Sequence, residues 1–373
     1  MKKQLNRRQW LRTAGLAGAA TLVGGTRLAS AKDNSPLFVR KAEGIAKLNA
    51  NENPYGPSPK VREALIEAFD LTCRYPFSHS GKLVGMIAEK EGVSPEHVLV
   101  TAGSTEGLRL AGMVYGMEGG EVVTAFPAFK TLLSYAEKFG AHVNKVPLTD
   151  ELQHDLAEMD RRITHKTSLV YVCNPNNPTG TINRGGELKD FCASVSRRTM
   201  TFVDEAYYDF IEEDNYPSMI ELVREGHNLI VARTFSKVYG LAGLRIGYLI
   251  ARPDIIERIG NYMVAFTNSL ALKAAEAALE DEEFYRFSLQ KNAEAKALIY
   301  QTLDQLDLPY QRSHTNFVFF KSGKNIVNLM EDMRAQQVII GRPFPPMTDW
   351  CRISTGTMED TRAFCEGLKE VMG

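Results

Sequence analysis

The chain has 373 residues, which is long enough to bury the cores of two domains. Hydrophobic residues make up 44% and charged residues 24% of it, the composition of an ordinary globular protein. The formal net charge is −1, so the charge suggests no nucleic acid and no acidic lipid surface as a partner.

The first 31 residues are typical of an export signal. Arg7 and Arg8 precede an uncharged stretch, Thr13 to Thr26, that is rich in Ala, Gly and Leu, and small residues follow up to Ala31. The apolar run is too short to span a bilayer. We therefore expect a twin-arginine signal peptide over residues 1–31, a twin-arginine translocase as transient partner, and a periplasmic or otherwise exported product. The alternative is a short amphipathic helix.

After the signal, short apolar runs alternate with stretches of helical spacing. The expected strands end near Val100, Val123, Val146, Val172, Val203, Ala232 and Ile250. This alternation predicts an α/β fold, a parallel or mixed sheet with helices on both sides. We expect an N-terminal arm over residues 32–60, a large domain over 61–260 and a smaller α+β domain over 261–373.

The most informative stretch is TFSKVYGLAGLRIGY, Thr234 to Tyr248. Lys237 follows an apolar run, and its amine can condense with an aldehyde to form a covalent anchor. Ser236 and Arg245 can hold a phosphate, one through a hydroxyl and the other through a rigid guanidinium fork. An aldehyde together with a phosphate describes pyridoxal 5′-phosphate (PLP).

Two earlier segments supply groups that PLP would still need. Asp204 ends the run TMTFVD, where a carboxylate can keep the pyridine nitrogen protonated. Tyr207 lies three residues further on and can reach the phenolic oxygen of the ring, as can Asn177 in the turn NPNNPTG. These residues and Ser104 all follow expected strand ends, which is where open α/β sheets bind ligands.

Together these motifs resemble the fold-type I, class I/II aminotransferases, over nearly the whole chain after the first thirty-odd residues. The resemblance implies that Ser104 and Thr105, in GSTEG, meet the cofactor phosphate at a helix N-terminus. It implies that Phe129 stacks on the pyridine ring, without the hydroxyl that a tyrosine would bring. Arg352, in CRISTGT, falls where the family binds the substrate carboxylate, with Asn316 in support.

Within the family, LNANENPYGPSP (Leu48 to Pro59) and RYP (Arg74 to Pro76) are similar to the histidinol-phosphate aminotransferases. There, a tyrosine matching Tyr75 reaches the cofactor phosphate of the other subunit, which implies a homodimer with shared sites. A tyrosine in the region of Tyr55 helps to close the substrate site.

Two positions depart from that branch. An arginine shortly before the carboxylate-binding arginine takes the substrate phosphate there, and here Arg342 is near that place but offset by Gly341. Phe77 follows RYP where the branch often has an acidic residue.

The resemblance implies an aminotransferase of amino-acid metabolism. It would move an amino group between an amino acid or amino-alcohol phosphate and a 2-oxo acid, with Lys237 as the general base. A PLP-dependent decarboxylase or lyase of the same fold is the first alternative. A second alternative is a PLP-binding sensor without turnover, against which the complete set of catalytic residues argues. A third is a dinucleotide-binding protein, against which it counts that the glycines of GLAGLRIG precede a strand instead of linking a strand to a helix. Five scattered cysteines predict mostly buried free thiols, with a single disulfide bridge as the alternative, and the spacing of His and Cys predicts no metal site.

Overall fold

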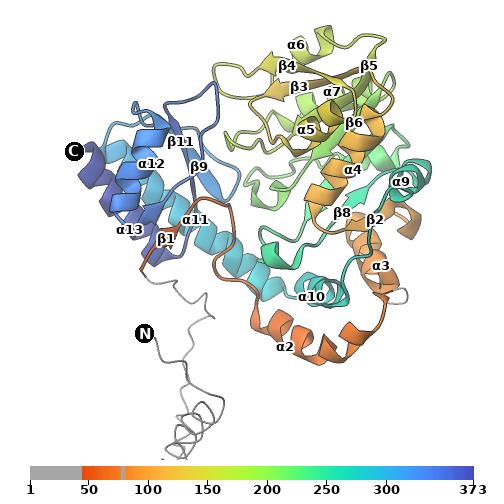
Figure 1. Cartoon of the computed structure of the whole chain (residues 1–373), viewed down its shortest axis with the longest axis horizontal. Helices are drawn as coiled ribbons and strands as arrows, with labels where there is room; N and C mark the ends of the chain where they lie inside the picture. Colours follow the sequence, from red (N-terminus) through yellow and green to blue (C-terminus); the bar gives the residue numbers. More distant parts are fainter. Residues whose placement is uncertain (1–43, 77–79) are drawn as a thin grey trace, which may run out of the picture. The chain divides into compact units, whose positions relative to one another are not determined.

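The computed structural model describes residues 44–76 and 80–373, all within the compact unit Leu37–Gly373 (Figure 1). The predicted signal peptide over residues 1–31 and the position of Phe77 lie outside these described residues. The proposed boundary between a large and a small domain stays a prediction.

The largest sheet has seven strands in the order β2-β8-β7-β6-β5-β3-β4. Its strands are β2 (Val98–Thr101), β3 (Glu121–Phe126), β4 (His142–Pro147), β5 (Thr167–Cys173), β6 (Met200–Asp204), β7 (Leu229–Thr234) and β8 (Gly247–Ile250). Only β8 runs against its neighbours. The predicted mainly parallel sheet is therefore confirmed, although β3 runs on to Phe126 rather than ending near Val123. The carboxyl ends of β2, β5, β6 and β7 consequently lie at one edge.

Helices cover both faces of this sheet, because its strands are apolar on both sides. In β5, Leu169 and Tyr171 pack on one face with α4, α5 and α9, whereas Val170 and Val172 pack on the other with α3, α7 and α10. The helices of this part are α2 (Pro59–Glu67), α3 (Ser80–Glu91), α4 (Ser104–Gly116), α5 (Thr131–Lys138), α6 (Leu156–Arg161), α7 (Gly185–Val195), α8 (Ile220–Arg224), α9 (Pro253–Gly260) and α10 (Ser269–Leu279).

The C-terminal part packs around two small sheets. Strand β1 (Ala46–Lys47) pairs in parallel with β10 (Val338–Ile339), and β9 (Phe317–Lys321) pairs antiparallel with β11 (Trp350–Ser354). These strands bury a separate apolar core against α11 (Glu282–Gln305), α12 (Ile326–Ala335) and α13 (Met358–Met372). The expected arm thus joins the C-terminal part of its own chain through β1 (Figure 1).

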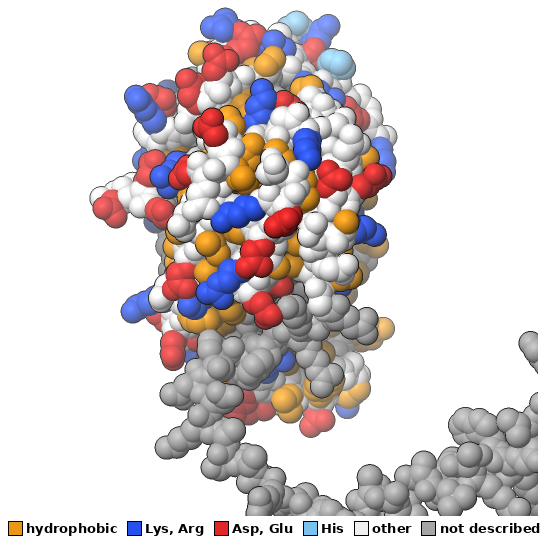
Figure 2. All heavy atoms as spheres, turned by 90° about the vertical axis from the view of Figure 1, so that its left-hand side faces the viewer, with side chains coloured by type: hydrophobic (Ala, Val, Ile, Leu, Met, Phe, Trp, Pro, Cys, Tyr) orange, Lys and Arg blue, Asp and Glu red, His pale blue; other side chains and the backbone are white. Residues whose placement is uncertain are grey.

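Surface and cysteine features agree with an ordinary globular protein. On the face shown in Figure 2, acidic and basic side chains are interspersed among small apolar areas. Among the described residues, no helix combines the length and the apolar character that crossing a membrane requires. Cys73 is exposed and the other four cysteines are buried, all as free thiols, as the sequence predicted.

Candidate active site

A cavity of about 360 Å³ lies at the edge where the parallel strands end. It brings together most of the residues that the sequence singled out. They are Ser104, Thr105, Phe129, Asn177, Asp204, Tyr207, Ser236, Lys237, Arg245, Arg342 and Arg352. Segments from Ala50 to Arg352, far apart in the chain, therefore converge on one space.

Asp204 is the last residue of β6, and its carboxylate is buried, with 3% of the residue exposed. Burial raises its pKa to about 6, although the backbone N–H of Ala206 (3.2 Å) and the Tyr171 hydroxyl (3.3 Å) donate to its oxygens. The surroundings of Asp204 thus supply too little positive charge to offset the cost of burying its ionised carboxylate. A cationic group in the cavity would stabilise it.

Lys237 follows β7 in the turn that closes the cavity, and its Nζ donates to the backbone oxygen of Asn51 at 2.8 Å. Burial, followed by the nearby Arg352 guanidinium, lowers the pKa of this amine to about 8. The neutral amine is therefore far more populated near neutral pH than it is in an ordinary lysine, and attack on an aldehyde and proton abstraction both require this neutral form.

Tyr207 presents a hydroxyl whose oxygen already accepts two hydrogen bonds. Asn51 Nδ2 donates at 2.9 Å and Asn177 Nδ2 at 3.4 Å. Burial raises the pKa of Tyr207 to about 12, so the hydroxyl keeps its hydrogen. That hydrogen is left to donate to an acceptor in the cavity.

One end of the cavity has the features of a phosphate cradle. Helix α4 begins at Ser104, and both Ser104 and Thr105 of its first turn line the cavity together with Ser236 and Arg245. The first N–H groups of a helix have no partner within the helix, so this turn suits an anion. Gly103 has φ +82°, and a Cβ there would lie 2.5 Å from Arg245 Nη2. Only glycine therefore allows this guanidinium to approach the start of the helix.

The other end is lined by two arginines. Arg352, 7% exposed, donates from Nη1 to Asn177 Oδ1 at 2.8 Å and from Nη2 to Asn49 O at 2.9 Å, whereas its Nε has no protein partner. Gly341 packs against the backbone of Arg352, where a Cβ would lie 2.4 Å from the carbonyl oxygen. This close contact brings Arg342 to the same cavity, so the offset inferred from the sequence does not remove it.

Three predicted residues do not line this cavity. Tyr55 and Asn316 line an adjoining pocket, where Tyr55 packs edge-on against Phe287 and Asn316 Nδ2 donates to Glu52 O at 3.3 Å. Tyr75 is 77% exposed and lies away from the site of its own chain. Tyr55 and Asn316 thus lie beside the site rather than in it, in a pocket that the arm itself helps to line.

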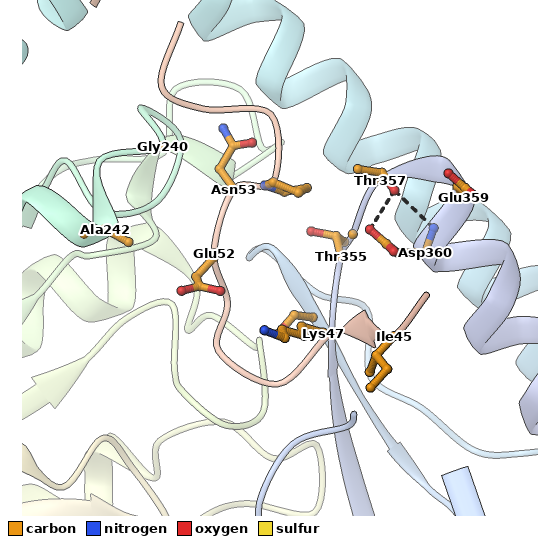
Figure 3. Close-up of a pocket in the computed structure, with 14 residues that line it drawn as sticks. Ile45, Lys47, Glu52, Asn53, Gly240, Ala242, Thr355, Thr357, Glu359 and Asp360 are labelled. Carbon is orange, nitrogen blue, oxygen red and sulfur yellow. Dashed lines mark hydrogen bonds between the residues drawn. The ribbon is translucent and has the colours of Figure 1, made fainter. Parts of the chain in front are cut away.

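A second cavity, of about 370 Å³, adjoins the first (Figure 3). The two share Glu52 and Ala242, and the second is lined by polar groups from the turn after β11 and from the first turn of α13, such as Thr355 and Asp360. Polar space therefore continues beyond the first cavity along the arm.

Sequence reasoning missed two groups at this site. Asn51 holds both Lys237 and Tyr207, and it has φ +54°, a left-handed conformation that asparagine tolerates. Its motif, NANENPYGP, resembles the histidinol-phosphate branch, but this resemblance predicts only Tyr55 as a site residue. Tyr171, which donates to Asp204, lies within the buried strand β5, where it cannot be distinguished from a core residue by pattern.

The cavity matches the groups of PLP one by one. Asp204 offers a buried carboxylate to the pyridine nitrogen, and Tyr207 offers a free O–H to the phenolic oxygen. Lys237 supplies the amine for the aldehyde, and the start of α4 with Arg245 suits the phosphate. Phe129 borders the same space with an aromatic ring. The residues present therefore fit this cofactor.

Comparisons with known proteins lead to the same conclusion. Residues 43–368 match the family described as aminotransferase class I and II. Histidinol-phosphate aminotransferases from Caldicellulosiruptor saccharolyticus and Moorella thermoacetica are 36% and 38% identical to this chain. Each match spans 88% of the chain, and 92% and 86% of those proteins.

Among solved structures, the histidinol-phosphate aminotransferase from Sinorhizobium meliloti, in complex with pyridoxal-5′-phosphate, matches with a TM-score of 0.80. It is 27% identical over 94% of this chain and 99% of its own. The family match covers most of the chain and the cavity carries the groups that the cofactor needs. This chain therefore belongs to the class I and II aminotransferases, and it is a PLP-dependent transaminase.

Proposed function

We propose that this transaminase uses a phosphorylated amine of the histidinol-phosphate type as amino donor and a 2-oxo acid as acceptor. The observation that carries the proposal is the pair Arg342 and Arg352. Both line the cavity, and neither forms an ion pair with a carboxylate among the described residues. Two guanidinium groups without a counter-ion suit a dianionic group such as a phosphate monoester. The names of the two relatives at 36% and 38% identity support this donor.

When bound, PLP supplies the aldehyde that takes up the amino group and a ring that withdraws electrons. Lys237 Nζ then takes the proton from the donor carbon that bears nitrogen, and its lowered pKa suits this task. With the cofactor bound, Asp204 would hold a proton on the pyridine nitrogen, and Tyr207 would donate its O–H to the phenolic oxygen. Arg352 and Arg342 orient the anionic end of the donor and later that of the 2-oxo acid.

A half-reaction screen of the purified enzyme tests the proposal. Each donor is added alone, and conversion of the cofactor to its aminated form is followed by visible absorbance. We expect histidinol phosphate to react faster than histidinol, which lacks only the phosphate. Equal rates with both donors would contradict the proposal. Release of CO2 from an amino acid without amino transfer would favour the decarboxylase alternative.

We also propose a homodimer whose sites are shared across the interface. Tyr262, Val264 and Phe266 are 43%, 94% and 65% exposed, and the first two border a pocket that also contains Thr105 and Arg245 of the phosphate cradle. Burial of this apolar segment against a second copy would cover the cradle from outside. Tyr75, strongly exposed in its own chain, is the residue that we expect to reach the other site.

Complementation tests the shared site. A mixture of the inactive variants Lys237→Ala and Tyr75→Ala should recover activity after subunit exchange, because one hybrid site is then intact. Each variant mixed with itself is the control. A fully active monomer by light scattering would contradict the proposal.

Export through the twin-arginine pathway is a third proposal, and its support is the sequence of residues 1–31. This pathway carries folded proteins, which suits an enzyme that binds its cofactor as it folds. Changing Arg7 and Arg8 together to lysine keeps the charge but removes the guanidinium geometry. We expect precursor with bound PLP to accumulate inside the cell. Export and processing at the wild-type rate would instead indicate the general secretory route.

A further inference from the structure

Arg342, Phe344 and Arg352 form a cluster at the wall of the active-site cavity. The guanidinium carbon of Arg342 lies 4.3 Å from the centre of the Phe344 ring, and that of Arg352 lies 4.9 Å from it. Phe344 itself is 4% exposed. One aromatic ring therefore contacts both cations of the proposed phosphate site.

Two neighbouring cations repel each other, so a further interaction is needed to keep them side by side before the substrate binds. Burial lowers the pKa of Arg352 to about 10. The positive charge of Arg342 lowers this pKa further, because the two cations repel each other. The face of an aromatic ring carries partial negative charge and attracts a guanidinium within about 6 Å. Phe344 offsets part of this repulsion without neutralising either charge, as a carboxylate would.

The position of the ring is fixed by the same strands that place Arg352. Phe344 packs edge-on against Phe319, with ring centres 6.1 Å apart, and Phe319 is stacked on Trp350 at 4.9 Å. Phe319 is also the cross-strand partner of Arg352 in the β9–β11 pair. Phe319 therefore supports both the Phe344 ring and the buried Arg352, and Arg342 is the exposed member of the cluster.

We propose that Phe344 is a positioning residue that holds Arg342 beside Arg352 and thereby sets the preference for donors with a dianionic end. This inference rests on the proposed function, because it assumes that the two arginines bind the donor phosphate. In this role Phe344 does not contact the reacting atoms. Its effect should therefore appear in donor affinity rather than in the chemical step.

The test compares Phe344→Leu with Phe344→Tyr in the holoenzyme. Leucine keeps the apolar volume but removes the ring, whereas tyrosine keeps the ring as a matched control. The measured quantity is the ratio of kcat/KM for histidinol phosphate to that for histidinol. We expect Phe344→Leu to lower this ratio about tenfold through KM, the size of one desolvated cation–π contact, and Phe344→Tyr to retain it. Calorimetric titration with inorganic phosphate should show the same weakening without turnover.

The outcomes separate this inference from the function on which it rests. A wild-type enzyme that does not discriminate between the two donors would overturn the proposed donor, and the role of Phe344 with it. A discriminating wild type with an unchanged ratio in Phe344→Leu would overturn the role of Phe344 alone. An equal fall in both variants would also overturn it, because the aromatic ring would then not be the cause.

Discussion

The seven-stranded sheet and the β9–β11 pair meet at one cavity but place their groups in different ways. Asp204 and Ser236 stand at the ends of parallel strands, so the strand order brings them together. Arg352 instead lies in the middle of an antiparallel strand, opposite Phe319, and its neighbours across the strands decide where it points. The cofactor end thus depends on topology, and the anion end depends on local packing.

The two regions also differ in the charge state that they favour for their titratable side chains. On the large-sheet side, burial moves the pKa of Asp204 up to about 6 and that of Lys237 down to about 8, so both groups are brought toward their neutral forms. On the other side both arginines stay protonated at neutral pH. The first region is suited to moving protons and the second to binding a fixed negative charge.

The largest effect on activity is expected from a change at Lys237, on the large-sheet side of the cavity. Lys237→Ala removes both the covalent anchor and the base, and we expect the rate to fall by about 10⁶-fold, as when a nucleophile and its base are lost together. Borohydride reduction of the wild type followed by peptide mass spectrometry should find the pyridoxyl group on Lys237. A pyridoxyl group on another lysine would contradict the site assignment.

Asp204→Asn tests the charge on the large-sheet side. A neutral amide cannot hold the proton on the pyridine nitrogen, so we expect kcat to fall by about 10³-fold, while the fold and donor affinity are retained. Steady-state kinetics together with circular dichroism check this. Near-normal turnover would mean that another group holds the proton.

The same residue makes a prediction about stability without cofactor. The folded-state pKa of Asp204 is raised from 3.8 to about 6, so the folded chain keeps a proton that the unfolded chain has lost. This contribution is complete below pH 3.8 and disappears as the pH rises through about 6, a change of roughly 3 kcal/mol for two pKa units. Urea unfolding of the apoenzyme should show that Asp204→Asn lacks this decline and is the more stable protein at pH 7. Parallel pH profiles of the two proteins would contradict it.

Arg352→Lys tests the anion end of the cavity, and its expected effect is the smallest. Lysine keeps the charge but cannot contact Asn177, Asn49 and a substrate anion in one plane. We expect KM for histidinol phosphate to rise about tenfold with little change in kcat, the loss of one charge-assisted hydrogen bond. Steady-state kinetics with both donors measure it, and an effect confined to kcat would argue against a binding role.

The two regions also differ in how far they could be predicted from the sequence. Asp204, Asn177 and Lys237 follow apolar runs that end in polar motifs, so the sequence located them and the strands that carry them. Tyr171 could not be found, because it resembles an ordinary core residue of a buried strand. Phe344 could not be found either, because it lies in the proline-rich loop GRPFPPM, whose local pattern does not indicate burial. Their roles depend on the side chains that they contact, and these are distant in the sequence.

The arm that carries Asn51 has a practical consequence for producing the protein. Leu48 O accepts from Ser354 N at 2.9 Å, Asn51 O accepts from Lys237 at 2.8 Å, and Asn53 Nδ2 donates to Val238 O at 2.8 Å. A fusion tag placed before Lys32 leaves all of these contacts intact. A truncation that starts beyond Ala46 would remove the β1–β10 pairing and loosen the arm. Expression vectors should therefore keep Ala46 and all residues that follow it. Cleavage by a contaminating protease between Leu48 and Asn53 should inactivate a preparation even though all its catalytic side chains are still present.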